Sequence, residues 1–342
     1  MIDDSIKQAF NLGEIDATPL TTGLINSTYI VTKQNGDKYL SQKINTNVFK
    51  TPQAIQENYV LISEQLNNKN SFELPELIKT SDENLFFTDN EGGVWRMFQY
   101  IPDSYSPLSS TTVEEASLVA ECFGKFSNDL KGLDTSKIQN VLPGFHDLAW
   151  RYEQFQESLT TATEERKEKA KDLIAKADEH KYLVDYYNTL AQDKENYPLH
   201  ILHHDCKIAN ILFDKNSKEI ICPVDLDTTQ NGYFFSDIGD MIRSMTPSLP
   251  EGSKEIDKIE LRKDFYEGIK KSYLSSMSEE LTEKEKQEID EAGKVIIYMQ
   301  SLRFLTDYLN NDVYYKTEYP EQNYFRAANQ FRLLELVTEY VG

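Results

Sequence analysis

Three polar side chains between residues 205 and 225 have the types and the spacing that phosphoryl transfer requires. The carboxylate Asp205 is followed five residues later by the amide Asn210, and a second carboxylate, Asp225, comes after a short apolar stretch. In phosphoryl transfer, one carboxylate orients the attacking hydroxyl and accepts its proton. An amide and another carboxylate hold the Mg²⁺ that spans the nucleotide phosphates. The set therefore predicts kinase chemistry, although either motif alone would also fit a buried polar loop between two strands.

Apolar residues on both sides of these side chains predict strands that position them. Ile211-Leu212-Phe213 follows the first motif, and Ile220-Ile221-Cys222 precedes the second. The catalytic loop of protein kinases spaces an aspartate and an asparagine in the same way, and its metal-binding aspartate follows one strand later. In this chain the motif is His203-x-Asp205-x-x-x-x-Asn210, whereas protein kinases have His-Arg-Asp.

The stretch from residue 21 to residue 31 is a candidate phosphate-binding loop. Gly23 lies among small polar residues that include Asn26 and Ser27, and a β-branched strand follows. A strand–turn–strand of this kind can fold over phosphates and offer them backbone N–H groups. A plain hairpin fits a single glycine equally well. The next turn, Gln34-Asn35-Gly36-Asp37, predicts a hairpin that joins strand 29–33 to strand 38–44.

Lys43 and Glu57 are candidates for the lysine–glutamate pair of a kinase. Lys43 stands where a kinase places its phosphate-binding lysine, and strand alternation puts it on one face with Tyr39 and Ser41. A solvated lysine is the alternative. Thr51-Pro52 predicts the start of a helix. Glu57 lies off the apolar stripe of that helix and could pair with Lys43, with Glu64 as a rival and a solvated glutamate as the alternative.

The strand predicted from residue 94 to residue 100 is followed by the polar stretch 103–111, which we take as a lobe boundary. We therefore predict an N-terminal nucleotide-binding lobe, residues 1–101, and a C-terminal catalytic and acceptor-binding lobe, residues 102–342. In a kinase, adenine bonds to the backbone at such a hinge, which here lies near Gln99 and Ile101. Thr112-Val113-Glu114-Glu115 then predicts a capping box and a helix.

The composition of the 342 residues limits the classes of function. Hydrophobic residues make up 39% and charged residues 27%, as is usual for a soluble globular protein. The net charge of −21 argues against a nucleic-acid partner, which needs a basic surface. We expect no membrane span or signal peptide. The three cysteines show no CxxC spacing, which predicts free thiols in a reducing cytoplasm.

Arg303 and Asp307 lie four residues apart on a predicted helix, and Tyr314 follows soon after. At this spacing the two side chains share a helix face. A cation, an anion and a nearby tyrosine would suit a sugar, because its hydroxyls need both donors and acceptors. A surface ion pair beside packing aromatics is the alternative.

Several stretches together resemble the N-acetylhexosamine 1-kinases of the aminoglycoside phosphotransferase and choline kinase superfamily. They are His203-His204-Asp205-Cys206-Lys207, Val224-Asp225-Leu226-Asp227-Thr228, Arg303-Phe304-Leu305-Thr306-Asp307, Gly23-Leu24-Ile25-Asn26-Ser27, Gln42-Lys43-Ile44-Asn45 and Trp95-Arg96-Met97. The similarity runs roughly from Leu20 to Leu334. It implies an α+β, protein-kinase-like fold with a small mixed β-sheet lobe and a larger, mainly helical lobe.

The resemblance also implies an activity and residue roles. The family transfers the γ-phosphoryl group of ATP, with Mg²⁺, to the anomeric hydroxyl of an N-acetylhexosamine. By this resemblance Asp205 is the base, and Asn210 and Asp225 are metal ligands. Asp205, Asp225, Thr228, Arg303 and Tyr314 would face the sugar, and Gly23, Asn26, Ser27, Lys43, Glu57, Gln99 and Ile101 would face ATP.

Two departures from the family pattern concern the site itself. The family usually has Asn-Asp-Thr-Lys where this chain has His204-Asp205-Cys206-Lys207, and family members often carry arginine where Lys43 stands. A kinase of a choline-like, hydroxylated amine or aminoglycoside acceptor is the nearest rival reading, because an acidic chain would suit a cation. Arg303 argues against it. A pseudokinase that serves as a binding module is the rival from another class.

Overall fold

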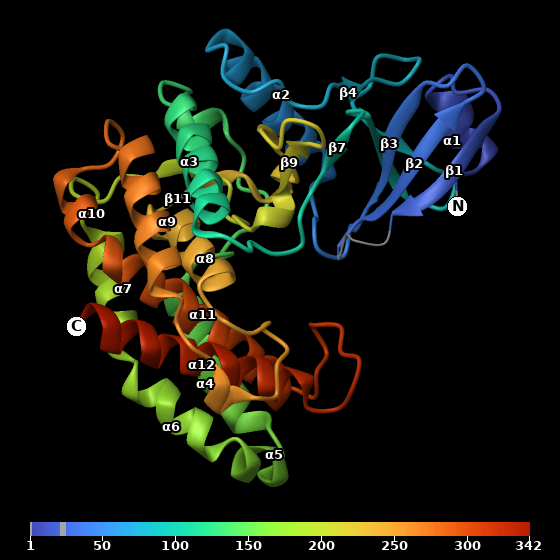
Figure 1. Cartoon of the computed structure of the whole chain (residues 1–342). Coiled ribbons are helices and arrows are strands. Elements are labelled where there is room, and N and C mark those ends of the chain that lie inside the picture. Colours follow the sequence, from blue (N-terminus) through green and yellow to red (C-terminus); the bar gives the residue numbers. More distant parts are fainter. Residues whose placement is uncertain (1, 21–24) are drawn as a thin grey trace. The chain divides into compact units, whose positions relative to one another are not determined.

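The hairpin predicted around residues 34–37 forms the centre of an antiparallel sheet in the computed structural model, which describes residues 2–20 and 25–342 (Figure 1). Among the described residues, six strands join this sheet in the order β1-β2-β3-β6-β4, with β5 also pairing with β6. The strands are β1 (Ile15–Leu20), β2 (Ser27–Lys33), β3 (Lys38–Ile44), β4 (Leu77–Ile78), β5 (Phe87–Thr88) and β6 (Val94–Gln99).

The two faces of this sheet have different coverings. On one face, Ile6 in α1 (Asp4–Ala9) packs in a cluster with Trp95 and Met97 of β6. On the other face, Ile55 in α2 (Pro52–Asn68) packs in a cluster with Val94. Because side chains alternate along a strand, neighbouring residues of β3 and β6 face different helices. This alternation decides which polar residues of the sheet can meet.

The chain divides into two units. The first comprises Met1–Ser106, Gly132–Pro143 and Leu212–Gln230, and the second comprises Pro107–Lys131, Gly144–Ile211 and Asn231–Gly342. Both units are discontinuous in sequence, whereas the predicted lobe boundary is a single cut after residue 101. Residues 212–230 join the first unit through pairing of β7 with β9 and through contact of α2 with η3. The remaining elements of this unit are β7 (Ser104–Tyr105), η1 (Thr135–Lys137), β9 (Ile211–Asp214), β10 (Ile220–Pro223) and η3 (Leu226–Thr228).

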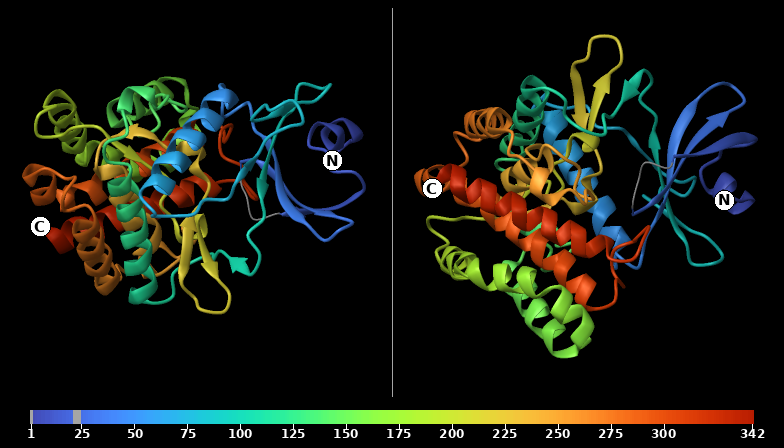
Figure 2. Two further views of the ribbon diagram at one scale, coloured as in Figure 1. Left: turned by 90° about the horizontal axis from the view of Figure 1, so that it is seen from above. Right: turned by 60° about the horizontal axis from the view of Figure 1, so that its bottom comes forward.

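The second unit is built around α11 (Ile289–Leu309), which is buried along most of its length. This helix packs against α12, α8 and α4, and Figure 2 shows α12 alongside it. A helix that is apolar on all sides is expected in the interior of a large unit. The other elements of the second unit are α3 (Val113–Asp129), α4 (Leu148–Thr161), α5 (Glu164–Lys169), α6 (Lys171–Glu179), α7 (Tyr182–Gln192), β8 (His200–Leu202), η2 (Ile208–Asn210), β11 (Gln230–Gly232), α8 (Phe235–Met245), η4 (Ile256–Lys258), α9 (Lys263–Ser276), α10 (Glu283–Gln287) and α12 (Gln322–Val341).

Local signals in the sequence set several helix starts. The capping box of Thr112 and Glu115 is confirmed, with both reciprocal hydrogen bonds present. Thr51 is the N-cap of α2, as predicted, but its side chain makes no capping bond. Ser236 and Asp237 lie in the first turn of α8, where no side chain caps the helix. No helix in residues 2–20 and 25–342 is long and apolar enough to cross a bilayer.

Candidate active site

The loop that carries Asp205 is fixed by buried groups from neighbouring helices. β8 leads into it, and the His203 ring lies edge-on to Phe123 and Phe126 of α3, with centroids 4.9 and 5.9 Å away. The Asp205 backbone N–H donates to His203 Nδ1 at 3.3 Å. Because Nδ1 is the acceptor, His203 must carry its proton on Nε2 when neutral. The first histidine of the motif therefore positions the loop.

Asp237 braces the same loop. Its carboxylate accepts the backbone N–H of His203 at 3.1 Å and that of His204 at 2.7 Å. These bonds hold His204 in the left-handed region, with φ 69°. Non-glycine residues in such conformations persist where the surroundings impose them, often at functional sites. Asparagine and histidine are both enriched in this region, which makes histidine a compatible replacement for the family's asparagine.

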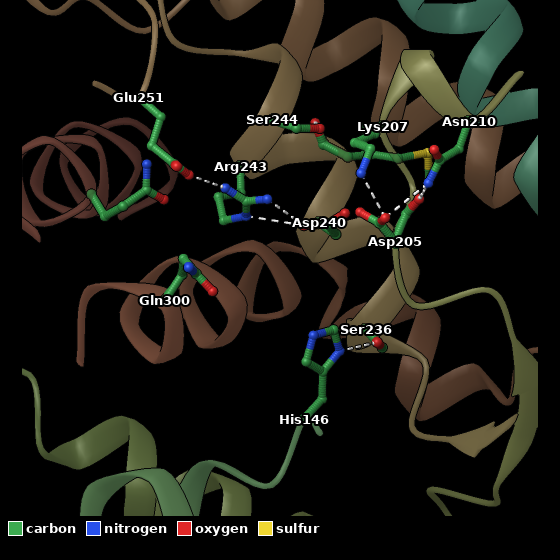
Figure 3. Close-up of polar contacts among 12 residues, drawn as sticks. His146, Asp205, Lys207, Asn210, Ser236, Asp240, Arg243, Ser244, Glu251 and Gln300 are labelled. Carbon is green, nitrogen blue, oxygen red and sulfur yellow. Dashed lines mark hydrogen bonds and ion pairs between the residues drawn. The ribbon is translucent and has the colours of Figure 1, made fainter. Parts of the chain in front are cut away.

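Asp205 is a half-buried carboxylate with two donors on one oxygen (Figure 3). Lys207 Nζ lies 2.7 Å and Asn210 Nδ2 lies 2.9 Å from Asp205 Oδ2. Burial alone would raise the pKa of Asp205, but the Lys207 ammonium and the Asn210 amide lower it below its ordinary value. The group is thus ionised at neutral pH. Oδ1, which receives neither bond, is the oxygen that can take a hydroxyl proton.

The two predicted metal ligands offer oxygen atoms. Asn210 donates through Nδ2 to the carbonyl and the carboxylate of Asp205, so its amide oxygen is the atom it can offer to a cation. Asp225 is exposed and has φ 63°, the second left-handed residue in the motifs. Amide and carboxylate oxygens are ligands that Mg²⁺ accepts. No group of three or more histidine, cysteine or acidic side chains in the described parts of the chain forms a closed metal cage.

The segment after Asp225 is anchored by a buried ion pair. Arg96 NH1 lies 2.6 Å from Asp227 Oδ1, and NH2 donates to Oδ2 at 2.8 Å. Arg96 Nε donates to Gln42 at 2.9 Å, and Asn26 Nδ2 donates to Asp227 Oδ2 at 2.8 Å. Strand register explains the set, because Gln42 and Arg96 are cross-strand partners on one face. The sheet therefore holds both Asn26 and the segment that carries Asp225.

The helix α2 anchors this segment a second time. Buried Asn58 donates to the carbonyls of Thr229, at 3.3 Å, and Gln139, at 2.9 Å. The predicted acceptor residue Thr228 lies between Asp227 and Thr229 and is itself buried. Asn58, and not Glu57, is the polar residue of α2 that reaches the segment.

The expected pair between Lys43 and Glu57 is wrong. Lys43 Nζ lies 3.8 Å from Asp89 and 5.7 Å from the Trp95 ring centroid, on the sheet face that α1 covers. Glu57 instead bonds to Gln53 at 2.6 Å and to Gln139. Lys43 does share a face with Tyr39 and Ser41, as alternation predicts, but Arg96 occupies the face toward α2.

The other nucleotide-side predictions fall in two places. Gly23 lies outside the described residues, while Asn26 and Ser27 lie at the entry to β2. At the predicted hinge, the Gln99 N–H donates to the Glu76 carbonyl at 2.8 Å. The Ile101 carbonyl accepts from Ser104 Oγ at 2.7 Å. The Gln99 N–H thus already has a hydrogen-bond acceptor, so an adenine ring at the hinge would have to bond to other backbone groups.

Arg303 does not pair with Asp307, so the surface ion pair that was the alternative in the sequence analysis is wrong. Buried Asp307 accepts the backbone N–H groups of Tyr314 and Tyr315, at 2.8 and 2.9 Å, and an amide N–H of Asn323. These three donors satisfy Asp307 and pin the loop after α11. The Tyr314 side chain is 64% exposed, and Tyr315 is the tyrosine that contacts Arg303.

Arg303 lies among aromatic and amide groups. Its guanidinium is 5.5 Å from the Phe145 ring centroid and 5.6 Å from that of Tyr315, and it donates to Gln300 at 3.0 Å. Gln300 in turn donates to the Tyr315 hydroxyl at 3.2 Å. Within the described residues, Arg303 has no carboxylate partner. The cluster thus combines a cation, hydroxyl and amide groups, and flat apolar rings.

A second arginine next to Asp205 is fully paired. Arg243 Nε and NH2 donate to Asp240 at 3.0 and 2.8 Å, and NH1 donates to Glu251 at 2.7 Å (Figure 3). Burial raises the pKa of Asp240, while Arg243 opposes this shift. The hydrogen bonds that Asp240 accepts thus come from Arg243.

Sequence reasoning gave no site role to several residues described above. They are Asn58, Arg96 and Asp227 in the first unit, and Lys207, Ser236, Arg243, Gln300 and Tyr315 in the second. Lys207 had a local signal, because it lies two residues after the candidate base. The partners of Arg96 and Ser236 lie far away in the sequence, and no local spacing indicates them.

Comparison with known proteins identifies a family and a fold for this chain. A sequence profile of the phosphotransferase enzyme family matches residues 16–261. A microcompartment-associated aminopropanol kinase aligns with a TM-score of 0.68 at 13% identity, covering 99% of this chain and 98% of that one. A spectinomycin phosphotransferase solved with ADP and spectinomycin aligns at 0.64 and 13%, covering 98% and 97%. A choline kinase from Cryptosporidium parvum Iowa II aligns at 0.56 and 15%, covering 96% and 91%.

At such low identities these alignments establish the fold. The predicted α+β, kinase-like class is confirmed, with a small antiparallel sheet and a larger helical part. The superfamily predicted from the motifs is confirmed as well.

Proposed function

This chain belongs to the phosphotransferase enzyme family, and we propose that it transfers the γ-phosphoryl group of ATP to the anomeric hydroxyl of an N-acetylhexosamine. N-acetylglucosamine and N-acetylgalactosamine are the acceptors, and the product is the sugar 1-phosphate. Asp205 orients the anomeric hydroxyl and takes its proton on Oδ1, while Lys207 and Asn210 hold Oδ2. The lowered pKa of Asp205 keeps this carboxylate ready to accept a hydrogen bond at neutral pH.

The environment of Arg303 is the observation that carries the choice of acceptor. Its guanidinium contacts two rings and a glutamine, and it has no carboxylate partner in the described parts of the chain. A guanidinium has only N–H donors, so without a counter-ion it favours ligands that bring oxygen acceptors. Hydroxyl and acetamide oxygens meet this need, and an ammonium group does not.

We infer that Asn26, Ser27 and the backbone near Gln99 and Ile101 lie on the nucleotide side. The spectinomycin phosphotransferase that shares the fold was solved with ADP, which supports the use of ATP here. Asn210 and Asp225 supply the oxygen ligands of Mg²⁺. When bound, the ion would neutralise charge on the phosphate groups. Lys43 pairs with Asp89 under α1, and we therefore give it no more than an indirect part in nucleotide binding.

A hydroxylated amine is the competing acceptor. The net charge of −21 would attract a cation, and two proteins of similar fold are an aminopropanol kinase and a choline kinase. Arg303 would repel such a cation at short range. A pseudokinase is disfavoured because Asp205, Asn210 and Asp225 are all present.

The test is an acceptor screen with Mg-ATP across N-acetylhexosamines, hexoses, choline, amino alcohols and aminoglycosides. We expect ADP release with N-acetylhexosamines and an acid-labile phosphate in the product, which marks anomeric phosphorylation. Turnover restricted to amines would overturn the sugar assignment. Absence of turnover with every acceptor would favour the binding module.

A further inference from the structure

Phe145 and His146 form a short segment ahead of α4 that is held by two arginines. Arg151 NH2 donates to the Phe145 carbonyl at 3.3 Å, and Arg303 lies 5.5 Å from the Phe145 ring centroid. The Phe145 and His146 rings stack with centroids 4.4 Å apart and an interplanar angle of 16°. The imidazole therefore has a defined place beside the Arg303 cluster.

One buried hydroxyl joins this imidazole to the catalytic loop. Ser236 Oγ is within hydrogen-bond distance of His146 Nδ1 and lies 2.6 Å from His204 Nδ1. The Ser236 side chain is fully buried and has a single proton. It can donate to at most one ring, and its two lone pairs can accept an Nδ1 proton from either ring. The serine therefore engages the Nδ1 atoms of both rings at once.

His204 cannot adjust freely to this arrangement. Asp237 fixes its backbone, and its ring packs so closely on Gly232 that a Cβ there would lie 2.3 Å from Cε1. Since His204 directly precedes Asp205, His146 is coupled to the base through Ser236. His146 and Ser236 lie in the same close-up as Asp205, Arg243 and Gln300, and the second ring nitrogen of His146 points away from Ser236 (Figure 3).

His146 is a neutral ring among cations. Burial lowers its pKa well below the ordinary value, and His204, Arg303, Arg151 and Arg243 lower it further. A neutral imidazole with one nitrogen engaged retains a second that can bond to a ligand.

We propose that His146 is an acceptor-binding residue, whose Nε2 forms a hydrogen bond with an oxygen substituent of the bound acceptor. Ser236 engages Nδ1 and so sets the direction in which Nε2 points. The inference rests on the proposed function, because it concerns the acceptor side of the same site. It adds a requirement on the acceptor, namely a second oxygen group beside the hydroxyl that reacts.

Two substitutions separate the ring nitrogens. In His146→Asn the amide lies near the position of Nδ1, keeps a partner for Ser236 and does not reach the position of Nε2. His146→Gln extends to the position of Nε2. We expect His146→Asn to raise the acceptor KM by about tenfold or more, as for a lost hydrogen bond whose partner stays desolvated. Its melting temperature and its KM for ATP should stay close to wild type, and His146→Gln should recover part of the acceptor KM.

A purely structural role of His146 predicts different kinetics. If His146 only braces the loop, His146→Asn will bind the acceptor like wild type, or both variants will lose stability and activity with every acceptor alike. Either result overturns the proposal. His180→Asn is the matched control, because His180 is another histidine whose pKa is lowered by burial, and the acceptor KM of this variant should not change.

The kinetics are measured with whichever acceptor the wild-type protein phosphorylates in the screen. A wild-type protein that phosphorylates no sugar would overturn the proposed function. An active wild type whose acceptor KM is unchanged in His146→Asn would overturn the role of His146 alone.

Discussion

Arg96 and Asp227, which lie 131 positions apart in the sequence, form a buried two-point ion pair. Both side chains are almost fully inaccessible to solvent, at 2% and 4% exposure. Paired Arg–carboxylate contacts of this kind are geometrically specific. The pair fixes the segment that carries Asp225 to β6, and Asn26 bonds to the same carboxylate. One interaction therefore relates a predicted phosphate-side residue to a predicted metal ligand.

Arg96→Met should strongly destabilise the protein, because it leaves Asp227 buried without its counter-ion. Removal of one partner of a buried pair costs roughly 3–5 kcal/mol. Urea unfolding of the variant measures this loss. The double variant Arg96→Met, Asp227→Leu should be less destabilised than Arg96→Met alone, since it removes the orphaned charge as well. A loss below about 1 kcal/mol in Arg96→Met would show that the pair is not a structural anchor.

Asp205→Asn should reduce kcat by about 10²–10⁴-fold, the usual contribution of a general base. The Asn side chain can still accept hydrogen bonds from Lys207 and Asn210, so the loop should keep its structure. Binding of ATP, measured by calorimetry, should stay close to normal. The control is Asp185→Asn, at an exposed position on α7. A decrease in kcat of less than about tenfold would remove Asp205 from the role of base.

His200 should make stability depend on pH. It is buried at the start of β8, with Nε2 2.9 Å from Glu285 and Nδ1 3.7 Å from Glu280. Burial alone would lower the pKa of His200, but the nearby carboxylates of Glu280 and Glu285 raise it to about 9. Because the pKa of His200 is raised in the folded state, its protonation contributes fully to the stability of the fold below the unfolded-state pKa, about 6.5. This contribution to the free energy of unfolding is lost as the pH rises toward 9.

We therefore expect the free energy of unfolding to fall between pH 6.5 and 9, by on the order of 3 kcal/mol. Urea denaturation across this range measures it. His200→Gln should be less stable near neutral pH and should show a flatter profile in the same window. A wild-type stability that stays constant from pH 6.5 to 9 would contradict the charged state of His200.

Local patterns in the sequence predicted the elements well and their partners poorly. The turn at Asn35-Gly36 and the capping box of Thr112 depend on neighbouring residues, so their signals survive in any context. Alternation placed Lys43 with Tyr39 and Ser41, but it could not indicate that α1 covers this face. The cation on the face toward α2 is Arg96, whose partner is set by the long-range path of the chain.

In the candidate site, too, short-range contacts were predicted from the sequence and long-range contacts were not. The spacing of Asp205 and Asn210 brings their side chains together, because the loop between them is short. The ion pair considered for Arg303 and Asp307 does not form, and the reason is physical. Asp307 is buried and takes two backbone N–H groups and an amide, which satisfy it better than a half-exposed guanidinium. The contact between Ser236 and His146 joins residues 90 positions apart and left no local signal.

Arg303→Ala tests the acceptor side directly. If the guanidinium donates to a sugar oxygen that is desolvated on binding, kcat/KM for the sugar should fall by about 10–200-fold, which corresponds to roughly 1.5–3 kcal/mol for a hydrogen bond to a charged group. The loss should come mainly from a higher KM for the sugar, while KM for ATP should not change. Amine acceptors, if they react at all, should not be weakened, because the variant removes a repulsive cation. Arg332→Ala, at a half-exposed arginine of α12 that pairs with Glu335, is the control and should leave the sugar KM unchanged.

The structural alternative makes a different prediction for the same variant. Arg303 packs on Phe145 and Tyr315, and its removal could loosen both rings. In that case the melting temperature would fall, and kcat/KM would decrease equally for every acceptor. Measuring stability and both KM values on one preparation decides between the two. A destabilised Arg303→Ala protein with an unchanged sugar KM would take Arg303 out of the acceptor site, and the choice of a hexosamine would lose its main support.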